Sequence, residues 1–324
     1  TALPPMLDSL PDAARLWLVP LDRTLDDAEA DALRQSVAGW LPSWQSHGRP
    51  VRAEAAVLSG RVLAVGAVIS EADLIILNGL SLEIPSLRMA EAIKKDAAVI
   101  LKLGDEAITE DQWIFDFSFP ELGGHPNPHL WTDPLLGLKY AELIKDALAR
   151  LDPPNLAYYQ ANYDKLKDRI EELDMRIAVA VATIPPENRR LLTYHDSFPY
   201  FAKRYGFQVI GAVQPSNFSE PSAREIGGLI DQAKETGVPA IFGSEVFPSK
   251  VMRQIAREAG TQFVDQLRDD DLPGKPGDPE HTYLGLILAD MRVMIPPLGG
   301  DIDELSGFDT SLVVGTATNA EYPQ

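Results

Sequence analysis

Two histidines in one proline-rich loop are the first candidates for metal or acid–base chemistry. His125 and His129 are two of the five histidines of the chain, and they lie in the segment GHPNPHLWTDP, residues 124–134. Neutral imidazole is the commonest metal ligand among side chains, and it titrates near physiological pH. Pro128 restricts the backbone before His129 and Trp131 can shield its ring, which lowers the entropy cost of presenting a nitrogen to a cation. We therefore predict that His129 is a ligand, whereas His125 is a solvated or hydrogen-bonded loop residue.

A second candidate follows a predicted strand. The segment TYHDSFPYFAKRYG, residues 193–206, begins where an apolar run over residues 191–193 ends, and His195 is the second residue after that run. Open α/β sheets present ligand groups at the carboxyl ends of their strands, so His195 is placed to bind. The neighbouring Asp196 could support an imidazole through a hydrogen bond, or it could cap the helix that follows, which is the commoner role of such an aspartate.

The third candidate is a carboxylate. Asp265 follows another predicted strand, residues 262–264, whereas Asp269–Asp271 in the same segment are expected to form a solvated face. The chain contains no cysteine, so disulfides and thiolate metal sites are excluded. Any metal must therefore be held by His, Asp or Glu.

The elements that must position these side chains alternate between strands and helices. Short apolar runs, expected to be strands, occupy residues 16–19, 62–69, 74–77, 98–101, 191–193, 208–213, 240–242 and 262–264. Helical patterns follow most of these runs, over residues 26–41, 86–94, 134–151, 221–236 and 249–259. This alternation is typical of α/β architecture, and it forms two sets of βα units.

One long amphipathic segment separates the two sets. Its apolar residues step by three or four over residues 156–181, as one face of a continuous helix would, and Pro185 and Pro186 end it. The segment is either a long surface helix on a single domain or a helix that joins two lobes, and we predict the second. The predicted organisation is an N-terminal α/β lobe over residues 1–154, a bridging helix over 155–184 and a C-terminal α/β lobe over 185–324.

The charge of the chain argues against polyanionic partners. The chain has 48 acidic residues against 29 Lys and Arg, and its formal net charge of −19 opposes binding to nucleic acid or anionic membranes. No apolar run approaches the ~18 residues that a membrane span needs, and the first residues, TALPPMLDSLPD, lack the basic start and apolar core of a signal peptide. We expect a soluble monomer that is a mature or trimmed form.

Five segments together resemble a known family. The segments are, in chain order, ADLIILNGLSLE, NPHLWTDP, TYHDSFPYFAKRYGF, EPSAREIGGLIDQAKETGVPAIF and FVDQLRDDDLPGKPGDPEHTYLGL. They are similar to segments of the solute-binding proteins of zinc and manganese ABC transporters, the cluster A metal-binding lipoproteins. The resemblance runs from about residue 71 to residue 300, and the residues before it do not share it. It implies two α/β lobes bridged by one long helix, with one divalent cation in the cleft between the lobes.

The resemblance also assigns the three candidates. His129 matches the ligand of the family's PHxWxDP loop, His195 matches the ligand that begins HDxFxYFxxxYG, and Asp265 matches a ligand aspartate after the last strand. Manganese members often have Glu where His195 stands, and a nitrogen-richer ligand set favours zinc, so the resemblance implies Zn²⁺ with Mn²⁺ as the alternative. It further implies a periplasmic or extracellular protein, either free or anchored through a lipid, that delivers the metal to the membrane permease of an ABC importer.

One ligand that the family supplies is missing. A further histidine from a loop before ADLI would fall near Val57, where this chain has no histidine. Three explanations stay open. His47, in SWQSHGRP, could reach the site, although a polar turn is the ordinary setting of an exposed histidine. Glu83 or a water could instead complete a tetrahedral zinc shell, or the site could be weakened.

Two other functions stay open beside metal capture. A zinc held by two histidines and one carboxylate, with Asp196 or Glu245 as a base, is conceivable in a hydrolase, but the chain has no HExxH or other hydrolase motif, so we do not expect an enzyme. A structural or adhesive protein that kept the fold and lost transport would fit the atypical first part of the chain. Tightly bound zinc, turnover of an ester or peptide, and an empty cleft would distinguish the three.

Overall fold

The computed structural model of the chain describes residues 15–20, 23, 25–40, 45–46, 49–50, 52–58, 62–68, 72–116, 118–214, 222–244 and 250–313. Within this part, the contacts between residues define two compact units. Unit 1 contains the described residues up to Leu77 together with Glu83–Leu101, and unit 2 contains Asn78–Leu82 and the described residues from Lys102 onward. The lobe boundaries that the sequence predicts at residues 154 and 185 stay a prediction.

Unit 1 is built on an antiparallel sheet in which β5 lies between β1 and β4. Its elements are β1 (Arg15–Pro20), α1 (Asp27–Trp40), β2 (Gln45–Ser46), β3 (Arg49–Pro50), β4 (Arg52–Leu58), β5 (Val62–Val68), β6 (Leu74–Leu77), α2 (Ile84–Ile93) and β7 (Val99–Lys102). The strands predicted over residues 16–19 and 62–69 and the helix over 26–41 are confirmed. Strand β4 was not predicted, because its sequence RAEAAVL is rich in alanine and charged residues, which are poor strand formers.

Unit 2 contains a parallel sheet with the strand order β11-β10-β8-β9. The strands are β8 (Arg190–His195), β9 (Gln208–Gln214), β10 (Ala240–Ser244) and β11 (Gln262–Leu267). Neighbouring residues of one strand enter different hydrophobic clusters: Leu191 and Phe242 belong to one, and Leu192 and Ile241 to the other. Because both faces of a parallel sheet are covered, its strands are continuously apolar, which is the pattern that predicted them.

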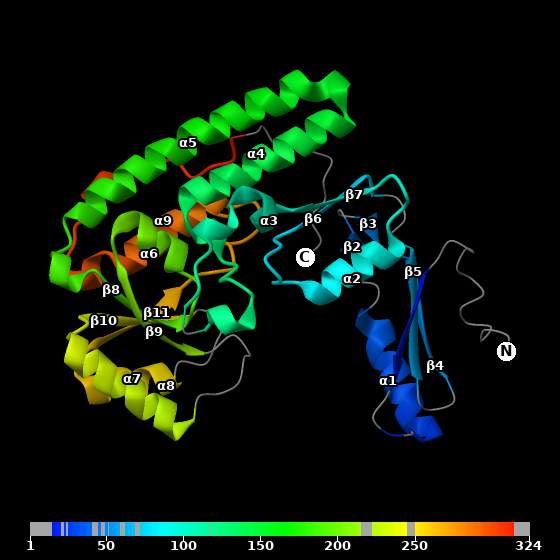
Figure 1. Ribbon diagram of the computed structural model, residues 1–324, viewed down its shortest axis with the longest axis horizontal. Helices are drawn as coiled ribbons and strands as arrows, with labels where there is room; N and C mark the ends of the chain where they lie inside the picture. Colours follow the sequence, from blue (N-terminus) through cyan, green and yellow to red (C-terminus); the bar gives the residue numbers. More distant parts are fainter. Residues whose placement is uncertain are drawn as a thin grey trace. The chain divides into compact units, whose positions relative to one another are not determined.

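Helices cover both faces of this sheet (Figure 1). The helices of unit 2 are α3 (Leu103–Ala107), α4 (Pro134–Leu151), α5 (Leu156–Ala182), α6 (Pro199–Tyr205), α7 (Ala223–Thr236), α8 (Lys250–Ala259) and α9 (Tyr283–Met294). Helices α7 and α8 pack on one face, and α5, α6 and α9 lie on the other. The resulting three-layer arrangement puts the carboxyl ends of β8, β10 and β11 along one edge.

The long helix predicted over residues 155–184 is confirmed as α5, a continuous helix of 27 residues that belongs to unit 2. Its inner face buries Ile170, Leu173 and Ile177, each no more than 1% exposed. Helix α4 runs beside it (Figure 1). This pair therefore forms a firm support for the loop that precedes α4 and carries His129.

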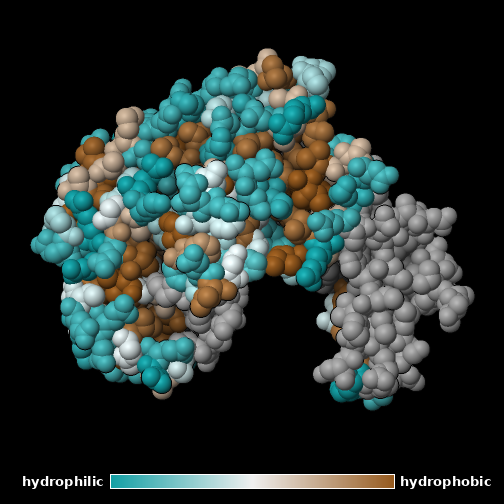
Figure 2. Space-filling view, in the orientation of Figure 1, coloured by the Kyte–Doolittle hydropathy of each residue, from teal (hydrophilic) through white to brown (hydrophobic). Residues whose placement is uncertain are grey.

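None of the described helices is both long and apolar enough to cross a bilayer. Figure 2 shows polar and apolar residues interleaved over the visible face of unit 2.

Candidate metal centre

His129 lies at the end of an irregular loop that is fixed on both sides. A single 3-10 turn, Leu130–Thr132, follows it, and Asp133 then caps α4 by accepting a hydrogen bond from the main-chain N–H of Leu135 at 2.9 Å. The hydroxyl of Thr132 donates to the carbonyls of His129 and Ser197, both at 3.0 Å. This loop is therefore tied to the segment that follows His195, and the His129 side chain is only 3% exposed.

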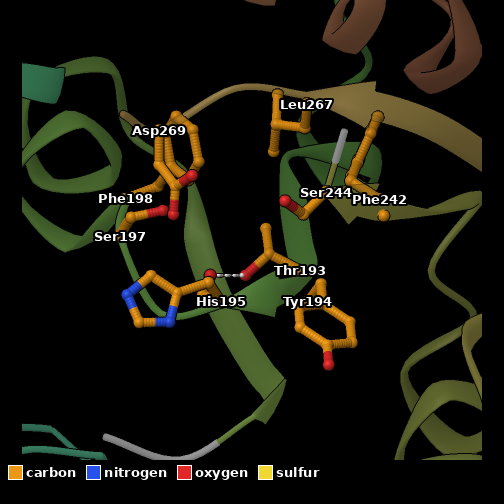
Figure 3. A pocket seen from close by; sticks show the side chains of 10 residues that line it. Thr193, Tyr194, His195, Ser197, Phe198, Phe242, Ser244, Leu267 and Asp269 are labelled. Atoms are coloured by element: carbon orange, nitrogen blue, oxygen red, sulfur yellow. Dashed lines mark hydrogen bonds between the residues drawn. The ribbon is translucent and has the colours of Figure 1, made fainter. Parts of the chain in front are cut away.

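His195 lies at the carboxyl end of β8, as predicted, and lines a small pocket. The pocket walls come from the ends of β8, β10 and β11 and from the residues after them (Figure 3). Figure 3 also shows Thr193 donating to the carbonyl of His195, at 2.6 Å. This hydrogen bond fixes the main chain where the strand ends.

The imidazole rings of His129 and His195 are in contact. Nε2 of His129 lies 3.1 Å from Nε2 of His195, and the rings are nearly perpendicular, with an interplanar angle of 82°. Two nitrogens bound to one tetrahedral zinc at ~2.0–2.1 Å would lie roughly 3.3–3.4 Å apart. The observed separation is therefore close to that of two ligands of one ion, although the residues lie 66 positions apart in the chain.

The hydrogen bonds of His129 determine which nitrogen carries its proton. Its Nδ1 lies 2.8 Å from Oδ1 of Asn127, and the same oxygen accepts the main-chain N–H of His129 at 3.0 Å. An amide oxygen only accepts, so Nδ1 carries the hydrogen and Nε2 of the neutral ring carries a lone pair. This is the form of histidine that binds a metal through Nε2, and the lone pair faces His195.

Burial keeps both rings neutral. Loss of solvent lowers the pKa of His129 well below 6.5, and the charge of a protonated His195 lowers it further. The pKa of His195 is also lowered by burial, and the carboxylate of Asp270 opposes this shift. Neutral imidazoles are the species that a metal requires, because protons compete with the ion for the same lone pairs.

The predicted third ligand does not join this pair. Asp265 lies in β11, where its Oδ2 is 3.9 Å from Nη2 of Arg253 and its Oδ1 accepts the main-chain N–H of Gln266 at 3.2 Å. Among the residues that the structure describes, no three His, Asp or Glu side chains are grouped closely enough to hold a metal ion. The assignment of Asp265 as a ligand stays a prediction.

Of the segment Asp269–Asp271, expected to be a solvated face, Asp270 and Asp271 are exposed as expected, whereas Asp269 contributes to the site. Asp269 is only 6% exposed, lines the pocket with His195, and receives a hydrogen bond from Nε1 of Trp131 to its carbonyl at 2.7 Å. Asp270 acts on His195 through its charge. Trp131 also lies beside the His129 ring, with 5.0 Å between ring centroids, so it shields that ring as predicted.

The side chain of Asp196 does not cap the helix that follows it, and its expected support of a histidine ligand stays a prediction. Phe198 occupies the N-cap of α6, and the carbonyl of Asp196, 2.8 Å from Nδ2 of Asn127, is the atom that connects this residue to the His129 loop. Its carboxyl group is buried near Asp116. Burial is the larger cause and the charge of Asp116 the smaller one, and together they raise the pKa of Asp196 to about 8.

The remaining candidates are separate from the histidine pair or outside the described residues. His125 is hydrogen-bonded to Ser81, with 3.0 Å between Nδ1 and Oγ, in agreement with its expected role as a loop residue. His47 and Glu245 lie outside the described residues, so the structure says nothing of either as a ligand or a base.

Asn127 is a residue of the site that was not predicted from the sequence. An Asn two positions before a histidine can bond that residue's main-chain N–H, and this turn signal could have found it.

Comparison with known proteins identifies the family. Residues 64–295 match the sequence profile described as "ZnuA: Zinc-uptake complex component A periplasmic". The chain belongs to this family. The resemblance from about residue 71 to residue 300 is thereby confirmed, as is the absence of a match over most of the first part of the chain.

The family includes relatives named for different metals. The chain is 30% identical over 217 residues to the iron-binding protein YfeA of Yersinia pestis, and this match covers 67% of each protein. It is 27% identical over 230 residues to the manganese-binding lipoprotein MntA of Halalkalibacterium halodurans, covering 71% of this chain and 73% of MntA. The relatives of this chain are therefore named for more than one metal.

A solved structure confirms the fold class. The periplasmic zinc-binding protein TroA of Treponema pallidum superposes with a TM-score of 0.63 at 26% sequence identity, over 71% of this chain and 82% of TroA. The predicted α/β architecture of a metal-binding solute-binding protein is confirmed.

Proposed function

We propose that this chain captures a divalent metal ion outside the cytoplasm and delivers it to the permease of an ABC importer. The observation that carries this proposal is the 3.1 Å separation between Nε2 of His129 and Nε2 of His195. Family membership supports the transport role, because the matched family is described as a component of zinc uptake. The ion is cargo, so the site needs only to hold and release it.

Zinc is the cargo that the donor set favours, with manganese as the alternative. Two imidazole nitrogens suit zinc, whereas manganese prefers oxygen donors. The carboxylate of Asp265 is the proposed third ligand. Its Oδ2 now lies 3.9 Å from Arg253, so ligation requires that the carboxylate leave this guanidinium.

Capture proceeds without chemistry on the ion. In the metal-free form, His195 donates Nε2–H to the lone pair on Nε2 of His129, which accounts for the short separation. When an ion binds, it takes the place of this shared proton, and His195 then holds its own proton on Nδ1. The loop of His129 and the end of β8 are already fixed, so little ordering is needed on binding.

Calorimetric titration of the metal-free protein with zinc tests this function. His129→Ala and His195→Ala should each lower zinc affinity by at least ~100-fold, beyond the 10–100-fold cost typical of residues that only support a ligand. His125→Ala is the matched control, because His125 is an exposed histidine bonded to Ser81, and it should leave the affinity unchanged. Failure of the wild type to bind zinc or manganese would reject the proposal, as would equal effects of all three substitutions.

A further inference from the structure

Asn127 is fully buried and contacts the segments of both histidines. Its Oδ1 accepts two hydrogen bonds from His129, one from the main-chain N–H and one from Nδ1. Its Nδ2 donates to the carbonyl of Asp196 at 2.8 Å and to Oδ2 of Asp116 at 3.1 Å. A single side chain therefore joins the ring of one histidine to the main chain next to the other.

Three of these contacts leave the amide only one orientation. Rotating it by 180° would place the NH₂ group against the main-chain N–H of His129 and the carbonyl oxygen against two acceptors, Oδ2 of Asp116 and the carbonyl of Asp196. The main chain of Asn127 is held as well, because its carbonyl accepts from the hydroxyl of Tyr200 at 3.0 Å and its N–H donates to the carbonyl of Ile114 at 2.9 Å. Asn127 is thus fixed before any ion arrives.

The fixed amide selects one tautomer of His129. With Oδ1 as acceptor, the hydrogen is held on Nδ1, whereas imidazole free in water carries it more often on Nε2. An unassisted ring would therefore more often turn an N–H toward His195, and Nε2 of His129 would then have no lone pair to offer a metal. The acceptor on Asn127 prevents this arrangement.

We infer that Asn127 is a positioning residue, which holds His129 in the Nδ1–H tautomer and fixes its ring to the main chain beside His195, so that a metal-binding lone pair is presented in advance. The part of this inference that concerns metal affinity rests on the proposed function. The part that concerns the tautomer does not, because it describes the metal-free protein.

Nitrogen-15 NMR of the imidazoles in the metal-free full chain at pH 8 tests the tautomer directly. The wild type should show His129 protonated on Nδ1, and Asn127→Asp, which keeps an acceptor at Oδ1, should show the same. Asn127→Leu, similar in size but without the acceptor, should shift His129 toward the Nε2–H form. Thr132→Val is the matched control, because it removes buried hydrogen bonds from the same loop without touching the ring, and it should leave the tautomer unchanged.

A wild-type His129 protonated on Nε2 overturns the inference, even if Asn127→Leu does not fold. An unchanged tautomer in a folded Asn127→Leu protein also overturns it. Zinc calorimetry on the same proteins then separates the two proposals. Asn127→Leu should lose about 10–100-fold in affinity. If the wild type binds no metal, the proposed function fails while the tautomer result still stands. If the wild type binds zinc and Asn127→Leu binds it equally well, the inference fails and the function stands.

Discussion

The hydroxyl of Tyr283 donates to the main-chain carbonyl of Trp131 at 2.8 Å, so the first residue of α9 holds the turn that follows His129. The ring of Tyr283 reaches this carbonyl by passing over Gly137 in α4. A Cβ atom at position 137 would lie 2.1 Å from the Tyr283 hydroxyl oxygen. The absence of a side chain at Gly137 therefore makes room for the ring of Tyr283, and this ring connects α9 to the loop of His129.

Gly137→Ala should displace Tyr283 and loosen this turn. We expect a loss of about 1–3 kcal/mol in the free energy of unfolding, as for other overpacked sites, measured by urea denaturation. Gly228→Ala is the matched control, since it also replaces a helical glycine, and a Cβ there would meet no described atom within 4 Å. It should stabilise the protein by up to ~1 kcal/mol through helix propensity. Similar effects of the two substitutions would contradict the role of Tyr283.

Arg204 is expected to stabilise the cap of α4. Its Nε donates to Oδ1 of the buried Asp133, and this contact opposes the burial that raises the Asp133 pKa. Arg204→Met would leave that carboxyl group without its partner and should cost about 3 kcal/mol, at the low end for buried pairs because Arg204 is partly exposed. Lys167→Met, which removes an exposed ion pair with Glu171, should cost less than ~1 kcal/mol in the same denaturation experiment. Equal losses would show that the Arg204 contact is no stronger than a surface pair.

Much of unit 2 could be predicted from the sequence because its hydrophobic patterns are regular. The helix over residues 155–184 and the strands over 208–213 and 240–242 appear close to their expected positions. Helix α9 was missed for a physical reason. Eight of its twelve residues are buried, so it is apolar on nearly every side and shows no amphipathic period.

The histidine pair could be predicted, whereas its support could not. His129 and His195 are marked by residue type, by their positions at a proline-rich loop and a strand end, and by the family motifs. The role of Asn127 depends on the orientation of one amide, which is determined by Asp116 and the carbonyl of Asp196. No sequence pattern shows which main-chain carbonyl will lie beside an amide from a segment about 70 residues away.

The contributions of two carboxylates can be separated by substitution. If Asp265 is a ligand, Asp265→Asn should lower zinc affinity more than tenfold at any salt concentration, because a bond to the ion is lost. Asp270 acts on His195 through its charge, so Asp270→Asn should have a smaller effect that fades as salt is added. Zinc calorimetry at low and high ionic strength distinguishes them. A larger, salt-independent loss in Asp270→Asn would transfer the ligand assignment to Asp270.

The buried Asp196 should make stability depend on pH. Burial and the charge of Asp116 raise its pKa to about 8 in the folded protein, whereas the ordinary pKa of an aspartate side chain is 3.8. Between these values the folded state keeps a proton that the unfolded state has lost. The folded state then binds more protons, so the free energy of unfolding falls as pH rises. The contribution is fully present below about pH 4 and is lost as the pH approaches 8.

Asp196→Asn should remove this dependence, because the amide resembles a protonated carboxyl group and cannot ionise. The stability difference between the variant and the wild type should therefore grow in favour of the variant as pH rises from 5 to 8, by up to ~1.4 kcal/mol per pH unit. Urea denaturation across this range measures it, and the contribution of the two histidines, which favours folding as pH rises through 6.5, largely cancels in the difference. Asp231→Asn, at an exposed position of α7, is the control, and its free energy of unfolding should depend on pH in the same way as that of the wild type. Parallel curves for Asp196→Asn as well would show that Asp196 ionises in the folded protein as readily as in the unfolded chain.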